Sequence, residues 1–281
     1  MNLLPSAPLG ATPVRAMTIA GTDSGGGAGV AADLRTFALS GVHGCVAVTA
    51  VTVQNSLGVS AVHTIPPEVV AGQIRAVVTD IGVQAMKTGM LANGAIIDAI
   101  VDVAAEVGLG RDRAIPLVVD PVCASMHGHQ LLAPEAMDTL RDRLIPIATV
   151  VTPNLDEVRL ITGIDVVDGD TQRQAAVVLH EMGAQWAMVK GGHLRSSPRS
   201  ADILYDGTEF LEFEHVRIDT PHDHGAGDTL ASAMCSALAH GMSVPDAATF
   251  AKAWVSESIR WSYPLGKGHG PVNPLWRVAG P

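Results

Sequence analysis

The sequence predicts an α/β fold in which helices cover both faces of a central, mainly parallel β-sheet. Short runs rich in β-branched residues alternate with helical patterns along the whole chain, which is the order that βαβ units produce. These runs are continuously apolar, as expected for strands buried on both faces. No change in composition and no linker divides the chain. We therefore predict a flexible N-terminal extension over residues 1–13 and a single domain over residues 14–281.

The predicted elements follow from hydrophobic period and from helix-ending signals. The predicted strands are Val14–Ala20, Cys45–Ala50, Gln84–Lys87, Pro116–Asp120, Thr149–Thr152 and Trp186–Lys190. The predicted helices are Val30–Leu39, Pro67–Asp80, Gly94–Val107, Pro134–Leu144, Leu155–Thr162, Thr171–Met182, one that follows Gly227, and Val244–Arg260. We also predict extra strands in segments 51–65 and 202–218, at an edge of the sheet or in a flap.

Composition excludes several classes of partner. With 281 residues and 47% apolar content, the chain can bury a large core. A net charge of −10 argues against a nucleic-acid or anionic membrane partner, and no apolar run is long enough to span a bilayer. The three cysteines form no paired motif, and residues 1–13 lack the charged and apolar parts of a signal peptide. We therefore expect a cytoplasmic protein.

The most informative segment is Thr220-Pro-His-Asp-His-Gly-Ala-Gly-Asp-Thr229, which precedes a helical pattern of small residues. Gly225, Ala226 and Gly227 would direct backbone N–H groups at one point, and the helix would add its unpaired first-turn donors and its dipole. Asp228 would supply a carboxylate base beside this anion cradle. That combination is suited to phosphoryl transfer onto an alcohol, although a plain turn with Asp228 as a helix cap has the same spacing.

Polar residues also follow three predicted strands, at the sheet edge where α/β proteins bind ligands. Lys190-Gly-Gly192 would bring a positive charge there, and Asp120 ends another strand. In Thr152-Pro-Asn-Leu-Asp-Glu157, the oxygen-bearing side chains of Asn154 and Glu157 are suited to a hydrated Mg²⁺. The same spacing is also that of a helix-capping box.

Three other ligand sites are disfavoured. Gly27-Ala-Gly-Val-Ala-Ala32 fits a dinucleotide fingerprint, but residues 34–67 contain no acidic residue to hold a ribose. A P-loop is absent, because Gly266-Lys267 lacks the earlier Gly and the following Ser or Thr. His222 and His224 lie two residues apart, but no third zinc ligand has a favourable spacing.

Taken together, the Gly-Ala-Gly-Asp, Asn-x-x-Glu and Lys-Gly-Gly motifs resemble those of the ribokinase-like superfamily. Further motifs narrow the resemblance to the hydroxymethylpyrimidine/phosphomethylpyrimidine kinases of thiamine biosynthesis. These motifs are Met17-Thr-Ile-Ala-Gly-Thr-Asp-Ser-Gly-Gly-Gly-Ala-Gly-Val-Ala-Ala-Asp33, Thr49-Ala-Val-Thr-Val-Gln-Asn55, Lys87-Thr-Gly-Met-Leu91, Val119-Asp-Pro-Val122, Thr152-Pro-Asn-Leu155, Lys190-Gly-Gly-His-Leu194 and Gly268-His-Gly-Pro-Val272. Many members of this family carry Cys where this chain has Asp228.

The resemblance implies a three-layer sandwich and two ATP-dependent steps in one site. The first phosphorylates 4-amino-5-hydroxymethyl-2-methylpyrimidine, and the second converts its monophosphate to the diphosphate. It also implies the following roles: Asp23, Gln54, Met90 and Val122 for the pyrimidine; Lys190, Thr152 and Gly192 for ATP; Asn154, Glu157 and Asp120 for Mg²⁺; Gly225, Ala226, Gly227 and Asp228 for catalysis. A homodimer is implied by resemblance alone.

Three alternative functions remain at this point. A pyridoxal or pyridoxine kinase would phosphorylate a similar hydroxymethyl group but stop at the monophosphate. A non-catalytic nucleotide-binding protein could keep the same fold, although Asp228 and Lys190 argue against it. A sugar kinase is disfavoured because Val51–Asn55 contains no carboxylate that could grip several hydroxyl groups.

Overall fold

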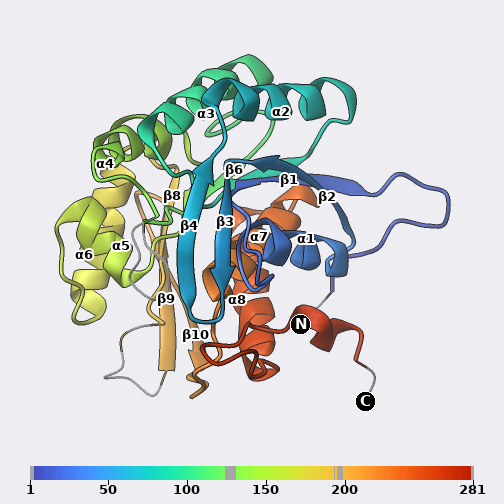
Figure 1. Cartoon of the computed structure of the whole chain (residues 1–281). Coiled ribbons are helices and arrows are strands. Elements are labelled where there is room, and N and C mark those ends of the chain that lie inside the picture. The colour runs from blue at the N-terminus through green and yellow to red at the C-terminus, as the bar shows by residue number, and fades with distance from the viewer. Residues whose placement is uncertain (1–2, 124–130, 193, 195–198, 280–281) are drawn as a thin grey trace.

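A mainly parallel sheet forms the centre of the computed structural model (Figure 1), which describes residues 3–123, 131–192, 194 and 199–279. Its strands are β1 (Val14–Ala20), β2 (Val42–Val48), β5 (Ala85–Thr88), β6 (Leu117–Val119), β7 (Val150–Val151), β8 (Trp186–Val189), β9 (Arg199–Tyr205) and β10 (Phe210–Val216). Within the described residues they lie in the order β10-β9-β8-β7-β6-β5-β1-β2. Neighbouring strands are parallel along the sheet from β2 through β1, β5, β6 and β7 to β8. Strands β9 and β10 then add an antiparallel edge.

Helices cover both faces of this sheet. One face carries α2 (Pro67–Asp80), α3 (Gly94–Val107), α4 (Ala136–Thr139), α5 (Leu155–Thr162) and α6 (Gly169–Glu181). The other face carries α1 (Gly29–Leu39), α7 (Ala226–Ala239) and α8 (Val244–Arg260). The π-helix η1 (Leu140–Leu144) continues α4, and the 3₁₀-helices η2 (Ile145–Ile147) and η3 (Pro274–Arg277) complete the helical segments. The predicted three-layer sandwich is therefore confirmed.

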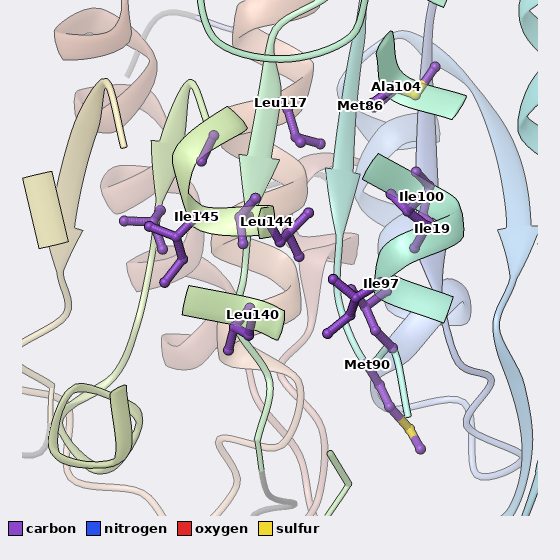
Figure 2. Close-up of a cluster of buried hydrophobic side chains, with 14 of the residues drawn as sticks. Ile19, Met86, Met90, Ile97, Ile100, Ala104, Leu117, Leu140, Leu144 and Ile145 are labelled. Atoms are coloured by element: carbon purple, nitrogen blue, oxygen red, sulfur yellow. The ribbon is translucent and has the colours of Figure 1, made fainter. Parts of the chain in front are cut away.

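Two hydrophobic clusters lie on opposite faces of the sheet, because successive strand residues point to opposite sides. In β5, Met86 belongs to the cluster with α3, whereas Ala85 belongs to the cluster with α7. Figure 2 shows the first cluster, in which Ile97 and Ile100 of α3 face the strands. Both faces of the strands are therefore buried, as their continuous apolar sequences predicted.

The β3–β4 hairpin stands apart from the main sheet. It consists of β3 (Ala50–Asn55) and β4 (Gly58–Thr64), which pair antiparallel in a sheet of their own. The expectation that segments 51–65 and 202–218 supply flap or edge strands is thus confirmed, with β3–β4 as the flap and β9–β10 as the edge.

Two predicted elements differ from the structure in more than the placement of an end by one or two residues. The predicted strand Cys45–Ala50 is wrong at both ends, since β2 runs from Val42 to Val48 and Ala50 begins β3. The apolar run continues through the turn between them, so hydrophobicity alone could not separate the two strands. The predicted helix Pro134–Leu144 begins at Ala136 and changes to π-helical hydrogen bonding at Leu140.

The segment ahead of β1 is partly anchored, because Leu4 is buried in the same cluster as Phe37 and Val42. Residues 1 and 2 of the predicted extension, and His193 of the Lys190–Leu194 motif, lie outside the described residues. The division at residue 13 stays a prediction. In the part of the chain that the structure describes, no helix is both long and apolar enough to cross a membrane.

The strand order places a binding crevice. From β1 the chain first moves to β2 on one side and later returns to β5 on the other. The loops that leave the carboxyl ends of β1 and β5 therefore diverge, and such a switch point is where open α/β sheets bind ligands.

Candidate active site

A cavity of about 290 Å³ lies at the carboxyl ends of the parallel strands. It is formed by the loops after β1, β5, β6, β7 and β8, by the start of α7, and by the flap strand β3. The predicted site residues that line it are Asp23, Gln54, Met90, Asp120, Val122, Asn154, Glu157, Lys190, Gly192, Gly225, Ala226, Gly227 and Asp228. The fold thus brings together residues that lie more than 200 positions apart in the sequence.

The start of α7 forms the floor of the cavity. The helix is buried from Thr229 to Ala239, so packing on all sides fixes where its first turn points. Gly225 caps it with φ 78°, and a Cβ atom there would lie 2.0 Å from the Gly27 carbonyl oxygen. The N–H groups of Gly227 and Asp228 have no intrahelical acceptor at these positions. Together with the helix dipole they suit this end of α7 to an anion.

Gly227 has a different role from Gly225. It does not have a positive φ, and a Cβ atom on it would lie 3.4 Å from Lys190 Nζ and 3.6 Å from Asp120 Oδ2. A side chain would therefore occupy the space beside these two charged groups, which are paired with each other. Because Gly227 has no side chain, that space stays open for a ligand.

Asp228 lies between the start of α1 and a buried lysine. Its Oδ1 atom accepts a hydrogen bond from the Gly29 N–H at 3.2 Å and lies 3.8 Å from Lys87 Nζ. Burial raises the pKa of Asp228 to about 6; Lys87 opposes this rise, and the carboxylates of Asp33 and Asp120 add to it. Asp228 is therefore mostly ionised at neutral pH yet more basic than an exposed aspartate, which suits a general base.

Lys190 brings positive charge to the cavity. Its Nζ atom donates a hydrogen bond to Asp120 Oδ1 at 2.9 Å, and its side chain keeps 13% of its surface exposed. Thr152 does not line the cavity. It is fully buried behind Asp120 and donates a 3.2 Å hydrogen bond to that carboxylate, so its position supports Asp120 and not a ligand directly.

Asn154 and Glu157 form the capping box that their spacing allowed. The Asn154 side chain accepts from the Glu157 N–H at 2.9 Å, and the Glu157 carboxylate accepts from the Asn154 N–H at 2.8 Å. Both residues also line the cavity. Burial raises the pKa of Glu157 to about 8, a shift that Lys190 opposes and Asp120 increases.

These oxygens are a donor set for a hydrated cation. Asp120, Asn154 and Glu157 line the cavity and carry carboxyl and amide oxygens. Within the described residues, no group of three or more His, Cys, Asp or Glu side chains is close enough to enclose a metal. Mg²⁺ keeps several waters and binds through one or two carboxylates together with phosphate oxygens, so this donor set fits it.

At the other end of the cavity, Asp23 organises the glycine-rich loop after β1. Its carboxylate accepts hydrogen bonds from the Gly25, Gly27 and Ala28 N–H groups at 2.7–2.9 Å, and His224 Nε2 lies 3.0 Å from it. Burial alone would raise the pKa of Asp23, but the hydrogen bonds from His224 and the backbone outweigh burial and hold it below its usual value. A direct substrate contact by Asp23 stays a prediction.

Gln54 reaches this end from the flap. Its amide nitrogen lies 3.5 Å from His224 Nε2, and its backbone exchanges two 2.8 Å hydrogen bonds with the Ser24 hydroxyl. Met90 and Val122 line the same cavity with apolar surface. An amide and a histidine beside apolar walls suit a small, flat heterocycle.

Sequence reasoning missed three residues of this site. His224 was considered only as a metal ligand, yet it contacts Asp23, while His222 Nδ1 accepts a hydrogen bond from the Gly270 N–H. Lys87 and Asp33 form a fully buried ion pair beneath Asp228. A lysine within the apolar strand Gln84–Lys87, and an aspartate on a largely apolar helix, were signals that could have identified them.

The fold and this site define a ribokinase-like kinase that acts on a small molecule. Within that class, the chain belongs to the phosphomethylpyrimidine kinase family, which it matches over residues 23–273. It is 62% identical to the hydroxymethylpyrimidine/phosphomethylpyrimidine kinase of Mycobacterium leprae, with 99% of each chain covered. It is 41% identical to the enzyme of the same name from Bacillus subtilis, covering 92% of this chain and 94% of the other.

Solved structures support the same class. An ADP complex of Bacillus subtilis pyridoxal kinase superposes with a TM-score of 0.86 at 36% identity, covering 94% of this chain and 98% of the other. A phosphomethylpyrimidine kinase from Clostridium difficile superposes with a TM-score of 0.76, also at 36% identity, covering 88% and 99%. Because both kinds of kinase share the fold, fold similarity alone does not separate the two substrates.

Proposed function

We propose that this protein uses ATP to phosphorylate 4-amino-5-hydroxymethyl-2-methylpyrimidine and then converts the monophosphate to the diphosphate, a role in thiamine biosynthesis. The observation that carries the proposal is the position of the Asp228 carboxylate. It lies at the start of α7, in one cavity with Lys190 and with the amide of Gln54. The 62% identity to an enzyme named for both activities supports the same substrates.

In the first step, Asp228 accepts the hydroxyl proton as the alcohol oxygen attacks the γ-phosphorus of ATP. A bond forms between that oxygen and phosphorus, the bond from phosphorus to the β,γ-bridging oxygen breaks, and ADP leaves. Lys190 and the N–H groups of Gly227 and Asp228 offer positive charge to the phosphoryl oxygens, where charge is spread during the transfer.

In the second step, an oxygen of the monophosphate is the nucleophile. The second pKa of a phosphate ester is about 6, so this oxygen is largely ionised at neutral pH and needs no base. The same cradle and the same lysine can serve both steps, because the transferred group is a phosphoryl group each time. One site therefore accounts for two products.

Mg²⁺ belongs to this proposal as the ion that would accompany the ATP phosphates. Asp120, Asn154 and Glu157 would hold it, largely through water, and the ion would neutralise charge on the β- and γ-phosphates. Chelation by EDTA should abolish turnover, and Mg²⁺ should restore it. Calorimetric titration of ATP with and without Mg²⁺ tests the same point without turnover, since Mg²⁺ should strengthen ATP binding in the intact protein and less so in Glu157→Gln.

A vitamin B6 kinase is the second candidate, because pyridoxal kinases share this fold. The test offers ATP with hydroxymethylpyrimidine, its monophosphate, pyridoxal or pyridoxine and identifies each product by mass. The pyrimidine diphosphate is the expected product. Pyridoxal phosphate without any pyrimidine diphosphate would support the second candidate, and no ADP release with any of them would support a non-catalytic binding protein.

A cytoplasmic location and a homodimer complete the proposed function. All three cysteines are free thiols and buried, which is common for proteins of a reducing compartment. Sedimentation or light scattering would measure the oligomeric state. A small molecule is the proposed partner, and no nucleic acid or membrane is expected.

A further inference from the structure

A buried lysine lies directly beneath the proposed catalytic carboxylate. Lys87, in β5, is fully buried. Its Nζ atom lies 3.0 and 3.2 Å from the two carboxylate oxygens of Asp33 in α1 and 3.8 Å from Asp228 Oδ1 in α7. One cation is thus shared between two carboxylates that come from different helices.

Asp33 is held in place from the other side. It accepts a hydrogen bond from the Thr18 hydroxyl at 2.6 Å and another from the Ser232 hydroxyl. Both Asp33 and Lys87 have side chains with no exposed surface. Neither can touch a substrate, so their effect on the reaction is exerted on groups that line the cavity. Asp228, whose side chain is 18% exposed, lies 3.8 Å from Lys87 Nζ, and Asp120 also interacts electrostatically with that lysine.

We propose that Lys87 and Asp33 are positioning residues that set the charge and orientation of Asp228 for its work as a base. The effect of the two residues on catalysis rests on the proposed function of the protein. Lys87 favours the ionised form of Asp228, and Asp33 limits that effect by neutralising most of the lysine charge. The pair leaves Asp228 ionised but still able to accept a proton.

Within the described residues, the charged and titratable groups that act most strongly on Asp228 come from four parts of the fold. They are Lys87 of β5, Asp33 of α1, Asp120 after β6 and His224 ahead of α7. Among them, only Lys87 and Asp33 have no exposed surface and lie outside the cavity. Substitutions there alter the field at Asp228 and leave the groups that line the cavity in place.

The two partners should act in opposite directions. Lys87→Met removes the positive charge, so the pKa of Asp228 should rise by about 1–3 pH units. Asp33→Asn removes a negative charge and leaves the lysine charge unpaired beside Asp228, so the pKa of Asp228 should fall by a similar amount. If Lys87 and Asp33 had only a structural role, the two substitutions would leave the pKa of Asp228 unchanged or would shift it in the same direction.

The experiment measures kcat against pH for hydroxymethylpyrimidine with the unaltered protein and both variants. We expect the acid side of the profile to move to higher pH in Lys87→Met, with activity recovering in alkaline buffer, and to lower pH in Asp33→Asn. Thr18→Val is the matched control. It removes a buried hydrogen bond to Asp33 without changing any charge, so it should destabilise the protein but leave the profile in place.

A second measurement keeps the test independent of turnover. The ¹³C shift of the Asp228 carboxyl, assigned by its loss in Asp228→Asn, should titrate with the same opposite shifts. If Lys87→Met does not fold, the double variant Lys87→Met/Asp33→Asn should titrate about 1–3 pH units above Asp33→Asn. Unchanged or parallel shifts would overturn the proposal. Opposite carboxyl shifts in a protein that turns over none of the offered alcohols would uphold the charge coupling and instead reject the proposed function.

Discussion

A Cβ atom on Gly225 would lie 2.0 Å from the carbonyl oxygen of Gly27, so the two glycine-rich loops of this protein meet backbone to backbone. The contact joins the loop after β1 to the start of α7. It brings Asp228 within hydrogen-bonding distance of the Gly29 N–H. The geometry of the proposed base therefore depends on two segments about two hundred residues apart.

Gly225→Ala should destabilise the protein and abolish turnover. A positive φ costs a non-glycine residue about 1–3 kcal/mol, and the overlap with Gly27 adds about 1–3 kcal/mol. Chemical denaturation measures the loss in the free energy of unfolding. Gly72→Ala is the control, since a Cβ atom there meets nothing within 4 Å and the residue lies inside α2. Near-normal stability of Gly225→Ala would mean that the loops can separate freely.

Gly227→Val should abolish turnover while the fold persists. Its Cβ would make only ordinary contacts with Lys190 and Asp120, but its methyl groups would fill the space beside this pair of charged groups. Thermal unfolding tests the fold, and ADP release tests turnover. A folded variant that still turns over would mean that this glycine serves the turn alone.

Lys190→Ala should weaken ATP use and leave pyrimidine binding nearly unchanged. A charge-assisted contact is worth about 1.5–3 kcal/mol, which corresponds to about a 10- to 150-fold rise in the KM for ATP. The exposed Lys267 provides the control variant Lys267→Ala. Calorimetric titration with the free pyrimidine decides the point, and an equal loss of affinity there would contradict the assignment of Lys190 to ATP.

Asp228→Asn should separate the two chemical steps. The alcohol step needs a base, whose loss costs about 10²- to 10⁴-fold in rate, whereas the monophosphate already carries an ionised oxygen. Each rate is measured separately, starting from each substrate. Equal losses in both steps would assign Asp228 a positioning role in place of that of a base.

The alcohol step should also weaken in acid. Asp228 accepts a proton only when ionised, and its pKa is about 6. The rate should therefore be nearly constant above that pH and fall about tenfold for each unit below it. The small residual rate of Asp228→Asn should not show this fall. If it does, the titrating group is another one, such as the phosphates of ATP.

The layers of the fold and most of the helices follow from local sequence, because periodicity reports burial directly. Helices α2, α3, α5 and α8 begin and end where the sequence predicted. The predicted strand boundaries were wrong where the apolar sequence continues from one strand into the next, as between β2 and β3. The π-helical hydrogen bonding of η1 leaves no mark on the apolar spacing.

The sequence likewise indicated some residues of the site and not others. The positions of Asp228 and Lys190 at the cavity were predictable because each residue follows a local signal, a glycine turn or a strand end. The partners Asp33 and Lys87 are 54 residues apart, and the contact of His224 with Asp23 spans 201. No periodic pattern encodes such pairings, since they exist only once strand order has placed the elements together.

The flap that carries Gln54 shares no strand pairing with the main sheet within the described residues. A hairpin of this kind can change in length and sequence at little cost to the core. The residues proposed to handle the phosphoryl group, by contrast, lie at the ends of buried strands and on a buried helix. Mutation can therefore alter which ring is accepted while the transfer machinery stays intact, and enzymes for two different vitamins can diverge on one scaffold.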